Sequence, residues 1–160
     1  MSDMQGAAKI FEAESAEQLA LKNFAALLAD TDFVAELELM DIGRLQFLLR
    51  RQMLVEWRGL YMALWRLALE KSFPQDADAM FDVFASGHRD SHPDKLSRAS
   101  LRRAEEYWAM LTPAGETDFN PVARHLASFF SEGRHDLRSL SLKLALHIRK
   151  TYKNIFDRLL

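Results

Sequence analysis

One segment constrains the fold more than any other. Residues 44–72 are predicted to form a long helix whose apolar side chains point in nearly every direction. A helix that is apolar all round has to be covered on all sides. In a chain of 160 residues, the simplest cover is the chain's own remaining helices, and burial of one face against another chain is the alternative. The apolar positions are Leu45, Leu48, Leu49, Met53, Leu54, Val55, Leu60, Met62, Leu64, Leu67 and Leu69.

The rest of the chain also has helical spacing of apolar residues, and no stretch alternates long enough to indicate a strand. Helices are expected near 7–29, 33–72, 75–86, 93–111, 120–131 and 136–160. The second has a candidate break at Asp41-Ile42-Gly43, because glycine is unfavourable inside a helix. Ser15 and Gln18 form a capping-box pattern, which predicts a late start of the first helix and looser order over 1–14.

These patterns predict a single all-α domain over residues 1–160, a helical bundle of five to seven helices around a central hydrophobic helix at about 44–72. The length suits one domain. The absence of cysteine excludes disulfides, cysteine zinc sites and thiol nucleophiles. The first residues lack the basic and apolar regions of a secretory signal. The longest apolar run contains Glu56, Arg58 and Arg66, so no membrane span is expected, and we expect a cytoplasmic protein.

An aromatic stripe lies on the predicted central helix. Trp57, Tyr61 and Trp65 recur at every fourth position and therefore share one face, with Arg58 beside them. Aromatic rings next to arginine anchor protein partners and hold flat ligands, although large aromatic residues also fill ordinary cores. These four residues are the candidates for partner binding.

Histidine and aspartate residues suggest a second kind of site. The pair His135-Asp136, with His88 and His92 before it and Asp157 after it, resembles in order the metal ligands of metal-dependent phosphohydrolases of the HD type. The chain departs from that family because Gly133-Arg134, rather than a hydrophobic helix, precedes the pair. The resemblance implies a metal site formed by His88, His92, His135 and Asp136. The other interpretation is a solvated loop at 88–94, with Asp136 as a helix N-cap.

Charge is distributed unevenly along the chain. Residues 1–40 hold two basic and eight acidic side chains, whereas residues 121–160 hold eight basic and three acidic ones. The basic helix 136–158 carries Lys143, Arg149, Lys150 and Lys153, a cluster of the type that binds phosphates. A short helix-turn-helix can be drawn from 120–131 and 136–150, because the connection at 131–135 resembles such a turn in length and in its glycine. A solvated face, or one that packs beside the acidic N-terminal segment, is the other reading.

The functional expectation combines these observations. The sequence contains no nucleophile turn of the form Gly-x-Ser-x-Gly and no glycine-rich phosphate loop, so it assigns no catalytic residue and no cofactor. The excess apolar surface of the long helix favours a non-enzymatic protein–protein interaction module, with self-association into a homo-oligomer as one form. A nucleic-acid-binding regulator is the alternative, and an HD-like hydrolase the second alternative. No membrane partner is expected.

Overall fold

The computed structural model describes residues 14–130 and 136–160, which contain seven α-helices and one 3-10 turn. This confirms the all-α fold that the sequence predicts. In chain order the elements are α2 (Ala16–Asp30), α3 (Val34–Leu39), α4 (Phe47–Ser72), α5 (Ala77–Ser91), α6 (Lys95–Leu111), the 3-10 turn η1 (Gly115–Thr117), α7 (Asn120–Ser128) and α8 (Leu137–Asp157).

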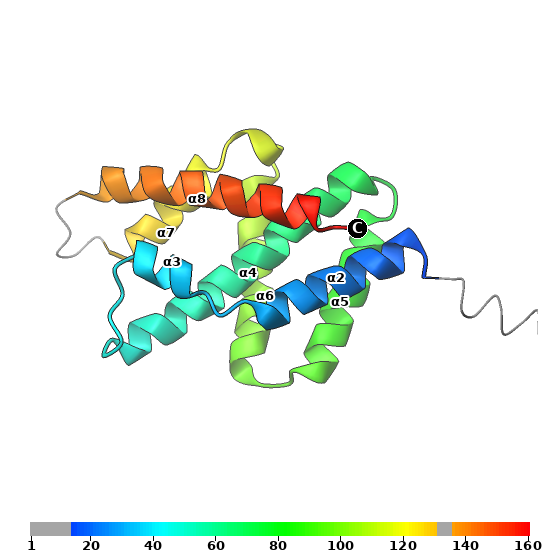
Figure 1. The fold of residues 1–160 in the computed structure, drawn as a ribbon, viewed down its shortest axis with the longest axis horizontal. Helices are drawn as coiled ribbons and strands as arrows, with labels where there is room; N and C mark the ends of the chain where they lie inside the picture. The colour runs from blue at the N-terminus through cyan, green and yellow to red at the C-terminus, as the bar shows by residue number, and fades with distance from the viewer. Residues whose placement is uncertain (1–13, 131–135) are drawn as a thin grey trace, which may run out of the picture.

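Helix α4 is the centre of the fold (Figure 1). It packs against α2, α3, α5, α6 and α8, and the buried side chains of Trp57, Met62 and Ala63 lie on different sides of it. The helix begins at Phe47 rather than at residue 44. The expected break lies just before it, where Asp41 adopts a left-handed backbone with a φ of 57° and ends the short helix α3.

An aromatic cluster joins three of the helices. The ring of Phe24 on α2 stacks on Trp65 of α4 with 4.5 Å between centroids and an interplanar angle of 6°. Phe84 of α5 meets both rings edge-on. Because aromatic side chains bury large areas and pair in such arrangements, this cluster fixes α2 and α5 against the central helix.

Helix starts follow the capping patterns in the sequence. Ser15 and Gln18 form the capping box of α2. The carboxylate of Asp94 accepts a hydrogen bond from the Ser97 amide at 3.1 Å, and that of Asp136 accepts one from the Ser139 amide at 2.8 Å. Each cap satisfies a backbone amide that has no partner within its helix.

The sequence suggested an extended loop at 88–94, and this prediction is wrong for most of the segment. Helix α5 continues to Ser91, and the chain leaves helical geometry at His92, with φ −131° and ψ 75°. The reason is local. Phe84, His88 and His92 are spaced four residues apart, so their rings stack on one helix face. Pro93 then forces His92 out of the helical region. Across residues 14–130 and 136–160, no helix has the length and apolar character to cross a membrane.

Candidate functional site

The predicted aromatic stripe lies in the core. Trp57 and Trp65 are almost fully buried and Tyr61 is nearly so. The Trp57 Nε1 atom donates to the sulfur of Met40 at 3.2 Å, and the Tyr61 hydroxyl donates to the carboxylate of Glu36. A partner that docks on the outer surface does not reach these three rings, so a docking surface has to be formed by other residues. Arg58, by contrast, is partly exposed and lines a cavity with His88 and His92.

The histidines and aspartates of the HD-type resemblance fall in different settings. His88 and His92 stack on each other with 4.4 Å between ring centroids, and Asp136 caps α8. His135 lies outside the described residues. Among the residues that are described, no three His, Asp or Glu side chains gather closely enough to hold a metal ion.

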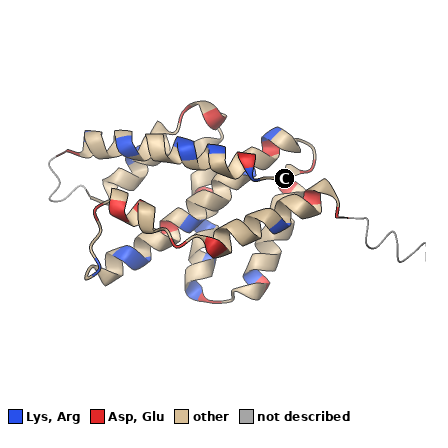
Figure 2. Ribbon diagram, in the orientation of Figure 1, with Lys and Arg blue, Asp and Glu red and all other residues tan. Residues whose placement is uncertain are grey.

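The basic residues of α8 are solvent-exposed. Lys143, Arg149, Lys150 and Lys153 all lie on the outer side of the helix, and Figure 2 shows lysine and arginine along its length. None of the four forms an ion pair with another residue of the described ranges. The charges of these four residues are therefore available to a partner. Helix α8 meets the acidic N-terminal part of the chain elsewhere, through His147 and Glu36.

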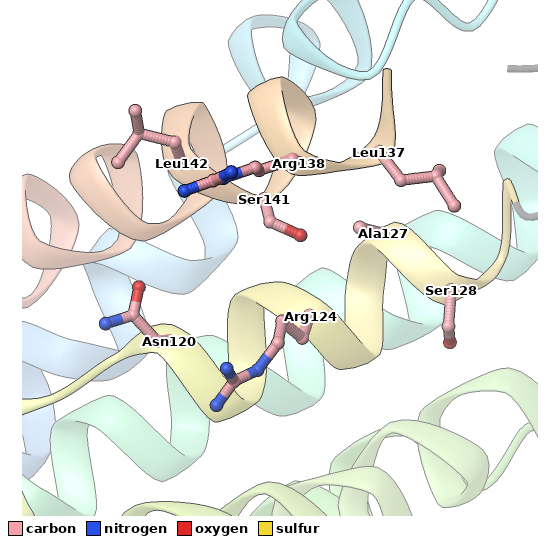
Figure 3. A pocket seen from close by; sticks show the side chains of 8 residues that line it. All are labelled: Asn120, Arg124, Ala127, Ser128, Leu137, Arg138, Ser141 and Leu142. Atoms are coloured by element: carbon pink, nitrogen blue, oxygen red, sulfur yellow. The ribbon is translucent and has the colours of Figure 1, made fainter. Parts of the chain in front are cut away.

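A groove of about 630 Å³ runs between α7 and α8. Small side chains leave this space open, because Ala127 of α7 and Ser141 of α8 face each other across it. Figure 3 shows the Ser141 hydroxyl directed toward α7 and the Asn120 side chain directed toward α8. The lining residues are Asn120, Arg124, Ala127, Ser128, Leu137, Arg138, Ser141 and Leu142.

The sequence explains why these two helices leave their outer edges open. Proline at the start of α7 fixes its first turn, and the helix buries its face with Val122 and Leu126. Helix α8 buries Leu140 and Leu144, one turn apart on its own inner face. The groove lies outside these two buried faces.

The groove continues into an exposed apolar strip on α8. Leu142 at its edge is 60% exposed, and Leu146, one turn further along the same face, is also 60% exposed. Exposed leucines that stand alone are normal on protein surfaces, whereas contiguous apolar surface marks binding sites. Together with the adjoining groove, these two leucines form one contiguous apolar surface.

Two arginines border the groove from opposite helices. Arg124 projects from α7 and Arg138 from α8 (Figure 3). Both are exposed, and neither has an ion-pair partner in the part of the chain that the structure describes. The groove thus combines an apolar floor with two guanidinium groups that an incoming carboxylate could pair with.

A second exposed apolar patch lies where α4 begins. Leu45, Phe47 and Leu48 are 85%, 71% and 84% exposed. Arg44 and Arg51 are exposed beside them. This patch belongs to the N-terminal part of the long helix, whose excess of apolar residues the sequence already indicated.

Two buried carboxylates escaped the sequence analysis. Glu56 of α4 is 1% exposed, and it accepts hydrogen bonds from the Tyr107 hydroxyl at 2.6 Å and from Arg103 Nε at 2.7 Å, both on α6. Burial and the hydrogen bond to Glu56 raise the pKa of Tyr107. A glutamate among the apolar residues of the central helix was the available signal, because a buried charge needs partners.

Glu36 forms the other buried network, between α3, α4 and α8. It accepts a hydrogen bond from Tyr61, and His147 Nε2 lies 3.3 Å from its Oε1 atom. Burial alone would raise the pKa of Glu36, but the hydrogen bonds from His147 and Tyr61 outweigh it and the pKa is lowered. Both carboxylates are satisfied by other helices of the same chain, so their role is to hold the fold together.

Comparison of the chain with protein-family models, with curated proteins and with solved structures finds no match.

Proposed function

We propose that the chain is a non-enzymatic docking module that binds an acidic amphipathic helix of a partner protein in the groove between α7 and α8. One observation carries the proposal: the apolar groove, the exposed strip of Leu142 and Leu146, and the unpaired Arg124 and Arg138 occupy one surface.

The shape of this surface favours a helix. Amphipathic helices bind by placing apolar side chains, spaced three or four residues apart, into a hydrophobic groove. Leu142 and Leu146 have the same spacing on α8, so they present apolar surface at matching intervals. A partner helix laid along α8 would cover both leucines and the apolar floor at Ala127.

The charge of the surface favours an acidic partner. Arg124 and Arg138 border the groove, and Lys143 and Arg149 are exposed on the same helix as the leucines. Complementary charge speeds association and selects against wrong partners. Exposed leucines between the basic side chains also favour a protein over a nucleic acid, because phosphate contacts need cations and gain little from leucine.

A synthetic helix of about 15 residues, with leucines four apart and glutamates elsewhere, is the probe. We expect it to bind and to perturb NMR signals of α7 and α8. Arg124→Gln combined with Arg138→Gln should weaken binding at least about tenfold, as should Leu142→Ser, because each removes roughly 1.4 kcal/mol or more. Lys95→Gln, an exposed cation on α6, is the matched control and should change binding less than about twofold.

Three outcomes would overturn this proposal. The first is equal binding of a peptide in which lysines replace the glutamates. The second is no measurable binding of the acidic peptide. The third is tighter binding of duplex DNA that is lost when Lys150 and Lys153 become glutamine, which would establish the nucleic-acid-binding alternative.

Self-association is the second candidate, and the patch of Leu45, Phe47 and Leu48 favours it. Exposed arginines flank this patch, and exposed acids at Asp30 and Asp32 offer complementary charge on a second copy. Sedimentation equilibrium of the wild type should then show a dimer, and Leu48→Ser should shift it toward monomer. A wild-type monomer at high concentration rules this candidate out.

A further inference from the structure

A separate cavity of about 280 Å³ lies between α2, α4 and α5, away from the α7–α8 groove. Ala25, Leu28 and Ala29 of α2 form one wall. Arg58 of α4 and the rings of Phe84, His88 and His92, which we call the ring row, form the others. A second hollow of about 420 Å³ on the same α2–α5 surface shares Ala25 and the ring row with it, so the two lie next to each other.

Within residues 14–130 and 136–160, the charge of Arg58 has no counter-ion. Its buried Nε atom has no hydrogen-bond partner there, and no carboxylate of these ranges pairs with the guanidinium. Its Cζ atom lies 5.9 Å from the centroid of the Phe33 ring. Because a partly buried cation is stabilised by an opposite charge, this wall of the cavity is complementary to an anion.

The ring row gives the cavity a flat, apolar side. Phe84 and His88 stack with 5.5 Å between centroids and an interplanar angle of 25°. His88 and His92 stack at 4.4 Å and 22°. The pKa of His88 is lowered, first by burial and then by the charges of His92 and Arg58, against an opposing effect of Asp94. At neutral pH the His88 ring is therefore neutral and suited to contact with another flat ring.

The same arrangement argues against a metal. Only two imidazoles converge here, and within the described residues no third ligand joins them. A guanidinium on the same cavity wall also repels a cation.

We infer that the cavity between α2, α4 and α5 binds a small aromatic carboxylate, with the carboxylate on the Arg58 guanidinium and the ring against Phe84, His88 and His92. The guanidinium is complementary to an anion, and the alanine and leucine wall is complementary to an apolar body. Small-ligand sites are typically concave, mostly apolar and equipped with a few polar groups, which describes this cavity.

Benzoate is the probe, followed by the NMR signals of the His88 and His92 rings. We expect saturable shifts at both rings and a rise in the pKa of His88 on binding, because an anion beside Arg58 offsets the charge that lowers it. Arg58→Gln should weaken benzoate binding about tenfold or more, the usual effect of losing a charge-assisted hydrogen bond. Arg58→Lys should have an intermediate effect, because lysine keeps the charge but loses the planar fork.

Two further variants guard against an effect on folding. Ala25→Phe should block binding by filling the cavity while leaving every charge in place. Lys22→Gln, at the rim of the neighbouring hollow and paired with Glu14, should change binding less than about twofold.

The inference fails if benzoate causes no saturable shift, or if Arg58→Gln binds it as tightly as the wild type. It also fails if acetate or inorganic phosphate binds as tightly as benzoate, because the apolar wall would then have no role. Equal binding of benzamidinium, a cation of the same shape, would contradict the role of Arg58. None of these outcomes bears on peptide binding at the α7–α8 groove, so the two proposals fail separately.

Discussion

Helices α4 and α6 meet without space between them, whereas α7 and α8 meet along an open groove. At the first interface a β-carbon placed on Gly59 would lie 2.6 Å from Arg103 Cβ and 2.8 Å from the Ser100 carbonyl oxygen. At the second, alanine and serine side chains leave about 630 Å³ unfilled. The first interface satisfies a buried charge internally, and the second leaves two arginines unpaired. The α4–α6 interface is closely packed and internally hydrogen-bonded, whereas the α7–α8 interface leaves the apolar and cationic surface on which our docking proposal rests.

The largest expected effect on stability comes from disrupting the interface between α4 and α6. Glu56→Ala should lower the free energy of unfolding by about 3–5 kcal/mol, because it leaves Arg103 and the Tyr107 hydroxyl without their buried acceptor. Chemical denaturation measures this loss. Glu56→Gln keeps an acceptor oxygen and should lose less. Equal losses for the two variants would mean that the negative charge of Glu56, which both variants remove, matters more at this position than its volume or its acceptor oxygen.

The next test places a methyl group at Gly59, where α4 closely approaches α6. Gly59→Ala should destabilise by about 1–3 kcal/mol, the usual cost of overpacking, because two of the atoms in the way are backbone atoms of α6. Gly87 of α5 is the matched control, since its β-carbon would meet nothing within 4 Å. Gly87→Ala should stabilise the fold by up to about 1 kcal/mol through helix propensity. A neutral Gly59→Ala would refute the close packing of α4 on α6.

Acid should act on the interface where α8 meets α3 and α4. The pKa of Glu36 is lower in the folded chain than its usual 4.5, so unfolding takes up a proton there. Its contribution to stability is present above pH 4.5 and is lost as the pH falls through the lowered value. Glu36→Gln should flatten the acid limb of the stability curve by up to about 1.4 kcal/mol per pH unit. A wild-type slope in the variant would show that other carboxylates cause the acid loss.

The smallest effect on stability is expected at the open groove. Leu142→Ala should change the free energy of unfolding by less than about 0.5 kcal/mol, because the side chain is already 60% exposed. Leu60→Ala, the same substitution at a fully buried position of α4, should cost about 2–5 kcal/mol. Comparable losses would show that Leu142 is covered in solution, and self-association would then have to be measured first.

The sequence predicted those features that depend on neighbouring residues. The central helix followed from apolar side chains on all its faces, and the caps at Ser15 and Asp136 followed from local hydrogen-bonding patterns. The end of α5 was missed because ring stacking of His88 and His92 extended the helix past the glycine.

The candidate sites could not be predicted in the same way. The α7–α8 groove depends on how two helices pack, which no spacing within either helix specifies. Likewise Arg58 and His88 lie on different helices, and the sequence assigned them to different kinds of site. Burial of Trp65 depends on the rings that α2 and α5 supply, and Trp57 packs against Met40 and against His147 of α8.

The central position of α4 has a consequence for how the molecule comes apart. Five other helices pack against α4, so all of those contacts are lost when α4 unfolds. Amide protons in the middle of α4, around Leu60 to Leu64, should therefore exchange with solvent only when the whole domain unfolds, while those of α7 exchange through smaller openings. A chain arranged in this way unfolds as one unit. Of the two helices that form the proposed docking surface, α8 packs on α4 directly, so α7 is the one expected to loosen while α4 stays folded.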